Sequence, residues 1–595
     1  RSASASAVPS WQATDRRVTF EPSLLAGDFT RRDTAANLQA KLTAQPFPFL
    51  RLSASVVGNP SWLRGDVPGR DGADDPDAPW SDYGWDFPNW SGALHADFTF
   101  GNKALLGFRA SFFSSNDWAD QKVVATEPRW EHGVFGNSIY PDIPAEYMRP
   151  SGWSNMSWDA AFGSKRQKER RAVVGGDFTY YLDLAGEHAL KAGLQWTRVA
   201  EDWDKSLSQP LIWLCWGEPA FLWGVDYGIG RYGHYAVFGN DATGPWGFYF
   251  DTASYRLALY LQDSWTIEDR LTINFGLRTE NEYFPSYSKD PALRDQRPIK
   301  FSFADKLAPR LGLVYDVAGD SSLKVFASYG IYYDVMKLYA AARVFGGYQT
   351  KAALYSLDTY DWTKIGIDGY YPGTFYAVVD QSMVDLNCAD PDLKPMSQSE
   401  LTFGAEKRLA ENISATARFV YKHLRYAVED FGAGEAGSVS GDVRYYFANP
   451  GYGYTRPMAE GGLLSDSYPA MPRAKRDYLA FSLALEKRFA GNWFGGFSYT
   501  LSRLAGNYPG LASSDENGRN SPNLERSFDY WFLLYTKDHQ LIDGPLPTDR
   551  THYLKAYGAY VFPWRLTVGT VVQAMSGVPI TEIWNVWDAD MRPYN

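Results

Sequence analysis

The residue types that support catalysis are scattered along this chain of 595 residues and form no recognisable catalytic motif. The sequence lacks His-Glu-x-x-His, Cys-x-x-Cys, Gly-x-x-x-x-Gly-Lys-Ser/Thr and Gly-x-Ser-x-Gly, which would indicate metal, redox, phosphate-binding or hydrolase sites. Solvated or strand-end positions are expected for His188, His234 and His423, because no ligand spacing connects them. The sequence therefore predicts no enzyme, no catalytic residue and no cofactor.

Two short segments match binding motifs only in part. Segment 228–233 has the Gly-x-Gly-x-x-Gly spacing of a dinucleotide fingerprint, but it follows a Trp-rich stretch and opens no amphipathic helix. Asp71, Asp74, Asp75 and Asp77 concentrate carboxylates that could hold Ca²⁺, but the glycine spacing of an EF-hand is missing. A solvated acidic loop is the preferred interpretation, so no metal site is predicted.

Charge and hydropathy restrict the class of protein. A net charge of -11 and a pI near 5.3 argue against a nucleic-acid partner. The mean hydropathy of -0.36, with no apolar run of about 18 residues, excludes a helical membrane protein but not a membrane β-barrel, whose strands alternate apolar and polar residues. Two cysteines, Cys215 and Cys388, are too few for a disulfide scaffold, and either a loop-to-loop disulfide or two free thiols would fit them.

The elements expected to position the polar side chains are hairpins with about ten alternating residues in each strand. Leu257, Leu259 and Leu261 alternate with polar neighbours, and the turn at 268–270 leads into a second alternating strand. Successive side chains of a strand point to opposite faces, so one set faces lipid and the other a wet lumen. The same unit recurs at 38–57, 90–113, 173–196, 311–332, 401–421, 479–501 and 554–574, giving about sixteen strands. The charged residues assigned to the lumenal face are Arg256, Arg278, Glu280, Arg310, Lys324 and Arg418.

Tight turns close the hairpins, whereas long segments join one hairpin to the next. This alternation of short and long connections is typical of an outer-membrane barrel with short periplasmic turns and long extracellular loops. It argues against a propeller, whose blades are evenly spaced. The predicted loops, expected to be irregular, are 58–89, 114–170, 202–251, 335–397, 429–474 and 505–550.

Aromatic residues in two of these loops are the best candidates for contact with a solute. Their rings offer flat apolar area at a small cost in conformational entropy. Loop-to-loop packing is the preferred explanation for any single one, although some are expected to line an entrance. The candidates are Trp203, Trp213, Trp216, Trp223, Tyr339, Phe345, Tyr348, Tyr355 and Tyr360.

Several motifs resemble those of TonB-dependent receptors. Tyr-Arg-Leu-Ala-Leu-Tyr-Leu-Gln-Asp-Ser-Trp at 255–265 and Arg-Leu-Thr-Ile-Asn-Phe-Gly-Leu-Arg-Thr-Glu at 270–280 are similar to paired strands of that family. Asp-Pro-Asp-Leu-Lys-Pro at 390–395 resembles its Asn-Pro-Asp-Leu-Lys-Pro approach to a strand. Further similar segments are Ala-Pro-Arg-Leu-Gly at 308–312, Tyr-Gly-Ile-Tyr-Tyr at 329–333 and, as in the Oar-like branch, Thr-Asp-Arg-Thr-His at 548–552 and Ser-Gly-Val-Pro-Ile at 576–580.

The resemblance implies an all-β, antiparallel transmembrane barrel in the bacterial outer membrane that imports a large or scarce solute. It also implies a TonB complex acting through a plug domain, with the lumenal charged residues bonded to that plug. Family members carry a plug before the barrel and close near 22 strands. Here about sixteen strands are predicted, and they begin by about residue 35, which leaves no room for a plug before them. Residues 1–595 are therefore expected to be a partial barrel domain. Its expected partners are outer-membrane lipids, an unknown solute and a surface lipoprotein.

Two other functions fit the same residues. A passive porin would use the sixteen or so strands as its whole barrel, and a non-transporting surface or adhesion protein would use the aromatic loops outside the cell. An outer-membrane hydrolase would need a convergent Ser/His or carboxylate set, which the sequence does not show.

Overall fold

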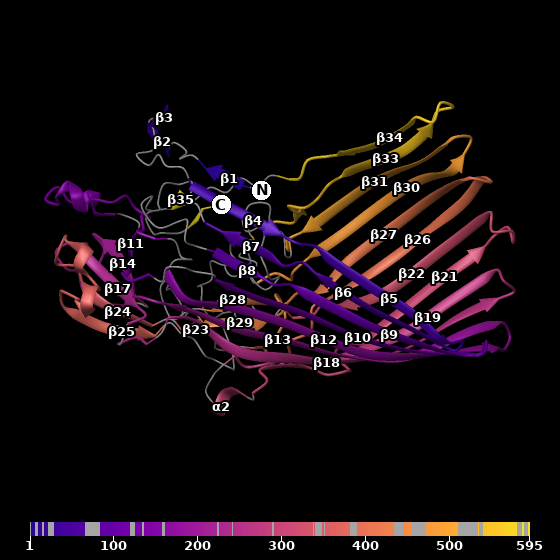
Figure 1. Cartoon of the computed structure of the whole chain (residues 1–595), viewed down its shortest axis with the longest axis horizontal. Coiled ribbons are helices and arrows are strands. Elements are labelled where there is room, and N and C mark those ends of the chain that lie inside the picture. Colours follow the sequence, from indigo (N-terminus) through magenta and orange to yellow (C-terminus); the bar gives the residue numbers. More distant parts are fainter. Residues whose placement is uncertain are drawn as a thin grey trace.

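The computed structural model contains one large antiparallel sheet and a second, smaller sheet built from the long connections (Figure 1). None of the helices in the described part of the chain is long and apolar enough to cross a bilayer. The residues that the structure describes are 2–5, 10–14, 17–21, 29–65, 84–119, 125–133, 136–156, 161–222, 225–240, 242–244, 246–287, 291–294, 296–336, 338, 345, 348–349, 351–380, 389–433, 444–453, 471–509, 534, 540–579, 586–587 and 593–594.

Sixteen long strands lie side by side within the described residues, each antiparallel to its neighbour. They form eight hairpins at the eight places where the alternation of residues predicted them. The hairpins are β5 (Leu38–Phe47) with β6 (Leu50–Gly58), β9 (Trp90–Phe100) with β10 (Ala104–Ala119), β12 (Phe162–Asp183) with β13 (Glu187–Leu207), β18 (Gly247–Ile267) with β19 (Leu271–Phe284), β21 (Ala308–Asp316) with β22 (Leu323–Tyr333), β26 (Ser397–Ala410) with β27 (Ile413–Tyr426), β30 (Arg476–Ala490) with β31 (Trp493–Gly506), and β33 (His552–Val561) with β34 (Thr567–Met575).

Shorter elements extend this sheet or stand apart from it. Those that pair with the large sheet are β1 (Ser2–Ala5), β4 (Phe29–Ala35), β7 (Ser61–Arg64), β8 (Gly84–Phe87), β20 (Ile299–Phe301), β23 (Tyr348–Gln349) and β32 (Gly544–Pro545). Separate small hairpins are β2 (Ser10–Thr14) with β3 (Arg17–Glu21), β15 (Phe221–Leu222) with β16 (Val225–Asp226), β28 (Glu429–Ala433) with β29 (Arg444–Ala448), and β35 (Val586–Trp587) with β36 (Pro593–Tyr594); α2 (Pro291–Arg294) is a single helical turn.

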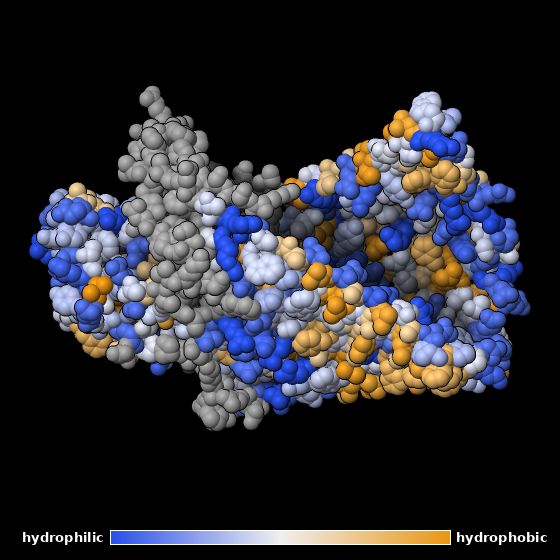
Figure 2. Space-filling model, in the orientation of Figure 1, coloured by the Kyte–Doolittle hydropathy of each residue, from blue (hydrophilic) through white to orange (hydrophobic). Residues whose placement is uncertain are grey.

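The two faces of the large sheet differ as the alternation predicts. Leu259 and Leu261 of β18 are 40% and 62% exposed, whereas Ala258, the residue before Leu259, is buried on the other face. Figure 2 shows apolar side chains gathered over the outer surface of the strands. We call the opposite, polar face the inner wall. The sheet therefore has the apolar exterior and polar interior that a membrane-spanning barrel requires.

The sheet is curved but not closed. No pairing joins β5 to β34 among the described residues, and both strands are exposed along their whole length on both faces. In the orientation of Figure 2, the hollow interior is visible through the gap. Unpaired backbone groups cannot face hydrocarbon, so these two edges must be covered by further protein in a bilayer.

The long connections contain paired strands, which corrects the prediction that they are irregular. Strands β12, β13 and β18 contain 22, 21 and 21 residues, about twice the length that spans a membrane, so they continue into segments predicted as loops. Beyond them, β11 (Arg129–His132), β14 (Leu211–Trp216), β17 (Gly233–Phe238), β24 (Lys351–Ser356) and β25 (Phe375–Asp380) form a five-stranded sheet, which we call the loop sheet. Figure 1 shows it at the end opposite the tight turns.

Close packing of the inner wall depends on glycine at Gly404 of β26. A Cβ added there would lie 2.4 Å from the carbonyl oxygen of Ala417 and 2.7 Å from the ring of Phe326. One of these neighbours is backbone, which cannot rotate away. Gly312 on the same face would have an ordinary contact instead, 3.5 Å from Asn274.

We therefore expect Gly404→Ala to lower the free energy of unfolding by about 1–3 kcal/mol, because the added methyl group overpacks the wall. The matched replacement Gly312→Ala should change it by less than about 0.5 kcal/mol. Urea unfolding of the protein folded into lipid vesicles measures both. Equal losses in the two variants would show that the tight contact at Gly404 is unimportant.

Candidate functional site on the inner wall

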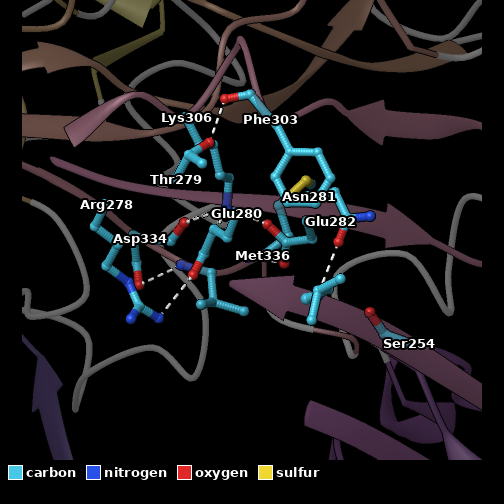
Figure 3. Close-up of polar contacts among 12 residues, drawn as sticks. Ser254, Arg278, Thr279, Glu280, Asn281, Glu282, Phe303, Lys306, Asp334 and Met336 are labelled. Atoms are coloured by element: carbon cyan, nitrogen blue, oxygen red, sulfur yellow. Dashed lines mark hydrogen bonds and ion pairs between the residues drawn. The ribbon is translucent and has the colours of Figure 1, made fainter. Parts of the chain in front are cut away.

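A buried lysine lies on the inner wall where β19 approaches the loops (Figure 3). The side chain of Lys306, which follows β20, is 0% exposed. Its Nζ donates to Glu282 Oε2 at 2.5 Å and lies 3.3 Å from Glu280 Oε1. A charge withdrawn from water is tolerated only when it is paired, and here two alternate carboxylates of β19 pair with one cation.

The same network connects the wall to the chain that follows β22. Lys306 Nζ donates to the Asp334 carbonyl oxygen at 3.2 Å, and the Met336 N–H donates to Glu282 Oε1 at 3.1 Å. Residues 334–336 begin the long connection that later forms β24 and β25. The network therefore fixes the start of a connection that supplies two strands of the loop sheet.

A row of alternating charges crosses the inner wall closer to the tight turns. Arg109 Nη1 contacts Asp177, Arg109 Nη2 lies 3.7 Å from Asp97 Oδ1, and Lys191 Nζ lies 2.9 Å from Asp177 Oδ1. A Cβ at Gly107 would lie 2.7 Å from Arg109 Nη1, so glycine leaves room for the guanidinium to lie across the wall. These contacts join β9, β10, β12 and β13 through side chains as well as through backbone pairing.

Between these two networks the wall is hollowed into a basin of about 550 Å³. Gly276 and Gly312 form part of its lining, where a side chain would otherwise project. Arg310 lies against the ring of Tyr332, 5.0 Å from its centroid. Arg278 Nη2 lies 3.3 Å from Glu280 Oε2.

The six charged residues predicted to face the lumen all lie on the strands of the large sheet, at positions that alternate with residues of its outer face. The structure brings Arg278 and Glu280 together and places Arg310 in the same basin. Contact of any of them with a plug stays a prediction. Their strands are β18 for Arg256, β19 for Arg278 and Glu280, β21 for Arg310, β22 for Lys324 and β27 for Arg418.

The loop sheet has an aromatic core. Trp216 and Tyr235, on neighbouring strands β14 and β17, are both 0% exposed. Trp216 Nε1 donates to Nδ1 of the buried His132 at 3.1 Å, and the His132 ring lies edge-on to Trp362 with centroids 4.8 Å apart. These residues come from connections far apart in the sequence, so hydrophobic burial holds the connections together.

His132 is neutral in this environment. Burial, together with the positive charge of the nearby Arg149, lowers its pKa to about 3. Arg149 lies over the rings of Trp153 and Trp362, 4.9 Å and 5.4 Å from their centroids. A protonated His132 would have no water and no carboxylate partner among the described residues, so protonation opposes folding of the loop sheet.

Of the predicted solute-contact residues in the loop sheet, some are buried in its core and others are exposed. Trp216 is a core residue that a solute cannot reach in this arrangement. Tyr355 is half-buried and stacks on Tyr235 with ring centroids 5.1 Å apart, and Tyr360 packs at the edge of the same core. Trp213 is exposed and stays a candidate.

The other predicted aromatic residues lie nearer the wall or outside the described part. Trp203 stacks on Phe250 in a cluster that also contains Phe345, and both Trp203 and Phe345 are buried, so they pack and do not face a solute here. Tyr348 belongs to β23. Trp223 and Tyr339 lie outside the described residues.

The polar motifs singled out in the sequence have ordinary structural roles where they are described. Segment 228–233 leads into strand β17 and not into a helix, unlike a dinucleotide site. His188 Nδ1 and His423 Nδ1 each lie 2.7 Å from an aspartate, and His234 Nδ1 lies 2.9 Å from the Glu218 carbonyl oxygen. Within the described chain, no group of three or more His, Cys, Asp and Glu side chains is arranged to hold a metal.

Only one of the two cysteines lies in the described chain. Cys215 lies on β14 as a free thiol, and burial raises its pKa to about 12, so it is not a reactive thiolate. Cys388 lies outside the described residues, as do Asp71, Asp74, Asp75 and Asp77 of the acidic segment.

Sequence comparison gives two matches. Residues 79–579 match the family model described as outer membrane beta barrel domain. The TonB-dependent transporter Oar of Myxococcus xanthus is 27% identical over 447 residues, which are 69% of this chain and 38% of Oar. The predicted resemblance to the Oar-like branch is therefore confirmed, and this chain spans about two-fifths of the length of that relative.

Structural comparison agrees on the fold. The outer membrane transporter YddB from Escherichia coli has a TM-score of 0.53 and 12% identity, covering 90% of this chain and 55% of YddB. The predicted antiparallel outer-membrane barrel is confirmed, although the sheet described here is open. The total of about 22 strands stays a prediction.

We expect Lys306→Met to lower the free energy of unfolding by about 3–5 kcal/mol, because Glu282 would stay buried without its cation. The double variant Lys306→Met/Glu282→Gln should recover part of the loss. Lys324→Met serves as the control, because Lys324 lies on the same wall and has no ion pair among the described residues. Urea unfolding in vesicles measures all three, and a loss as large for Lys324→Met would contradict the role of the buried pair.

The folded loop sheet should lose stability as the pH falls from about 6.5 toward 3. His132 in the unfolded chain takes up a proton in this range, whereas the folded state, with a pKa of about 3, does not. His132→Phe should therefore melt with a weaker dependence on pH, and His552→Gln, on β33, controls for loss of a histidine. Thermal unfolding followed by near-ultraviolet circular dichroism between pH 4.5 and 7.5 measures the slope. Equal slopes in wild type and His132→Phe would contradict this assignment.

Proposed function

We propose a transport function for this chain, which belongs to the outer membrane beta barrel domain family and lies in the bacterial outer membrane. The chain forms the barrel part of a TonB-dependent transporter that imports a large or scarce solute. The observation that carries this proposal is the similarity to the TonB-dependent transporter Oar across 69% of the chain.

The character of the inner wall supports passage of a polar solute. The face away from lipid carries the buried Lys306 network, the Arg109 row and the basin between them. A protein that only anchored a surface structure would not need a polar, hollowed interior. Charged groups on a low-dielectric wall also raise the local concentration of solutes of opposite charge.

Active uptake requires a gate, and the proposal places it in a plug domain that is not part of residues 1–595. The Arg109 row and the inner-wall charges outside the basin would bond to such a plug, and those within the basin would line the path of the solute. The TonB complex, powered by the inner-membrane proton gradient, would displace it. The exposed loop-sheet aromatics, Trp213 among them, would meet the solute first.

The test begins with the protein from its native membrane. Its intact mass and N-terminal sequence should reveal residues before Arg1 that encode a plug and a TonB-contacting segment. A mature chain that begins at Arg1 would overturn gated uptake.

The second part of the test measures transport directly. Cells without this protein and cells without TonB should leave the same solutes unconsumed in a defined medium that wild-type cells deplete. Depletion that needs the protein but not TonB would indicate a passive porin, and no difference in depletion would indicate a surface protein. Vesicle swelling with sugars of graded size separates these two outcomes.

A further inference from the structure

The basin on the inner wall has an unusual balance of charge. Its lining includes the cations Lys191, Arg278 and Arg310. The one carboxylate residue among its lining residues, Asp263, lies two residues after the outward-facing Leu261 and so on the same outer face, where its side chain bonds to His188. The described lining therefore directs cationic groups, and no carboxylate, into the space.

The three cations are held to different degrees. Lys191 pairs with Asp177 at 2.9 Å, and Arg278 lies 3.3 Å from Glu280, which Lys306 also neutralises. Arg310 has no carboxylate within ion-pair distance among the described residues. Of the three, Arg310 is therefore the cation with an unused fork of N–H donors.

The position of Arg310 is nevertheless defined. Its guanidinium lies 5.0 Å from the ring centroid of Tyr332, and the Tyr332 ring lies over Gly330, where a Cβ would come within 3.0 Å of it. Gly330 is the register partner of Arg310 on β22. Glycine at this position lets the tyrosine lie along the wall and support the guanidinium, so the donors are oriented before any ligand arrives.

We propose that this basin is a binding subsite for the carboxylate or phosphate group of a small organic anion. Arg310 binds the oxyanion through its fork, Arg278 lines the space beside it while paired with Glu280, and Gln262, Asn274 and Ser328 offer neutral hydrogen-bonding groups. The rings of Tyr260 and Tyr332 border the space and favour an anion attached to a flat apolar group. The subsite rests on the proposed transport function, because it lies on the path of a solute through the lumen.

Along that path, the basin comes after the Lys306 network when a solute enters from the loop side. Glu280 and Glu282, nearer the loops, would repel an anion if they were free, but Lys306 pairs with both. The buried lysine and Arg278 together balance the two carboxylates at the approach to the basin. An anion entering from the loop side would meet neutralised carboxylates and then unused positive charge.

The test measures binding of phenyl phosphate to the detergent-solubilised chain by isothermal titration calorimetry. Arg310→Gln should weaken binding by about tenfold or more, because a charge-assisted pair of hydrogen bonds is lost. Arg418→Gln is the matched control, since Arg418 lies on the same face three strands away and has no ion pair among the described residues. It should change the affinity by less than about twofold.

Two further measurements, with a second variant and a second ligand, complete the test. Arg310→Lys should bind with intermediate affinity, because it keeps the charge and loses the fork. Inorganic phosphate should bind more weakly than phenyl phosphate. The subsite is overturned if the wild-type chain does not bind phenyl phosphate, as would occur if a carboxylate of the protein itself filled the basin. It is also overturned if Arg418→Gln loses as much affinity as Arg310→Gln. Binding of phenyl phosphate without any TonB-dependent depletion would leave the subsite standing and remove the proposed transport function.

Discussion

The peptide groups of a chain inside hydrocarbon have no water to bond to, and this constraint governs the rest of the structure. Each strand must satisfy its N–H and C=O groups on its neighbours, which is why the sixteen long strands follow one another in strict antiparallel order. The same constraint requires cover for β5 and β34, whose residues are exposed on both faces. A sheet of this kind has one face for lipid and one for a lumen, so its polar groups are collected on the inner wall.

The inner wall manages its charges through local neutralisation. Lys306 is balanced by Glu280 and Glu282, and Arg109 by Asp97 and Asp177. Glycines opposite or beside large side chains leave room for those side chains to lie along the wall. The basin near Arg310 differs because positive charge there is not fully balanced by the described residues. That imbalance is what makes it a candidate for solute contact.

Hydrophobic burial organises the long connections outside the membrane. Segments from three of them meet in the loop sheet, and Trp216, His132 and Trp362 pack in its core. The Lys306 network fixes the start of one of these connections to the wall. Aromatic residues in these segments therefore mainly pack in the core. The candidates for solute contact are the exposed ones outside the core, such as Trp213.

The hairpins, their tight turns and the face occupied by Arg278, Glu280 and Arg310 could be predicted from the amino-acid order alone, because a period of two depends only on strand geometry. The same parity could have pointed to Arg109 and Asp177, which lie in predicted strands, but not to their pairing. The burial of Lys306 against β19, outside any long strand, and the core positions of Trp216 and Phe345 became apparent only in the folded chain. Those outcomes depend on contacts between residues far apart in the chain, for which a local pattern carries no signal.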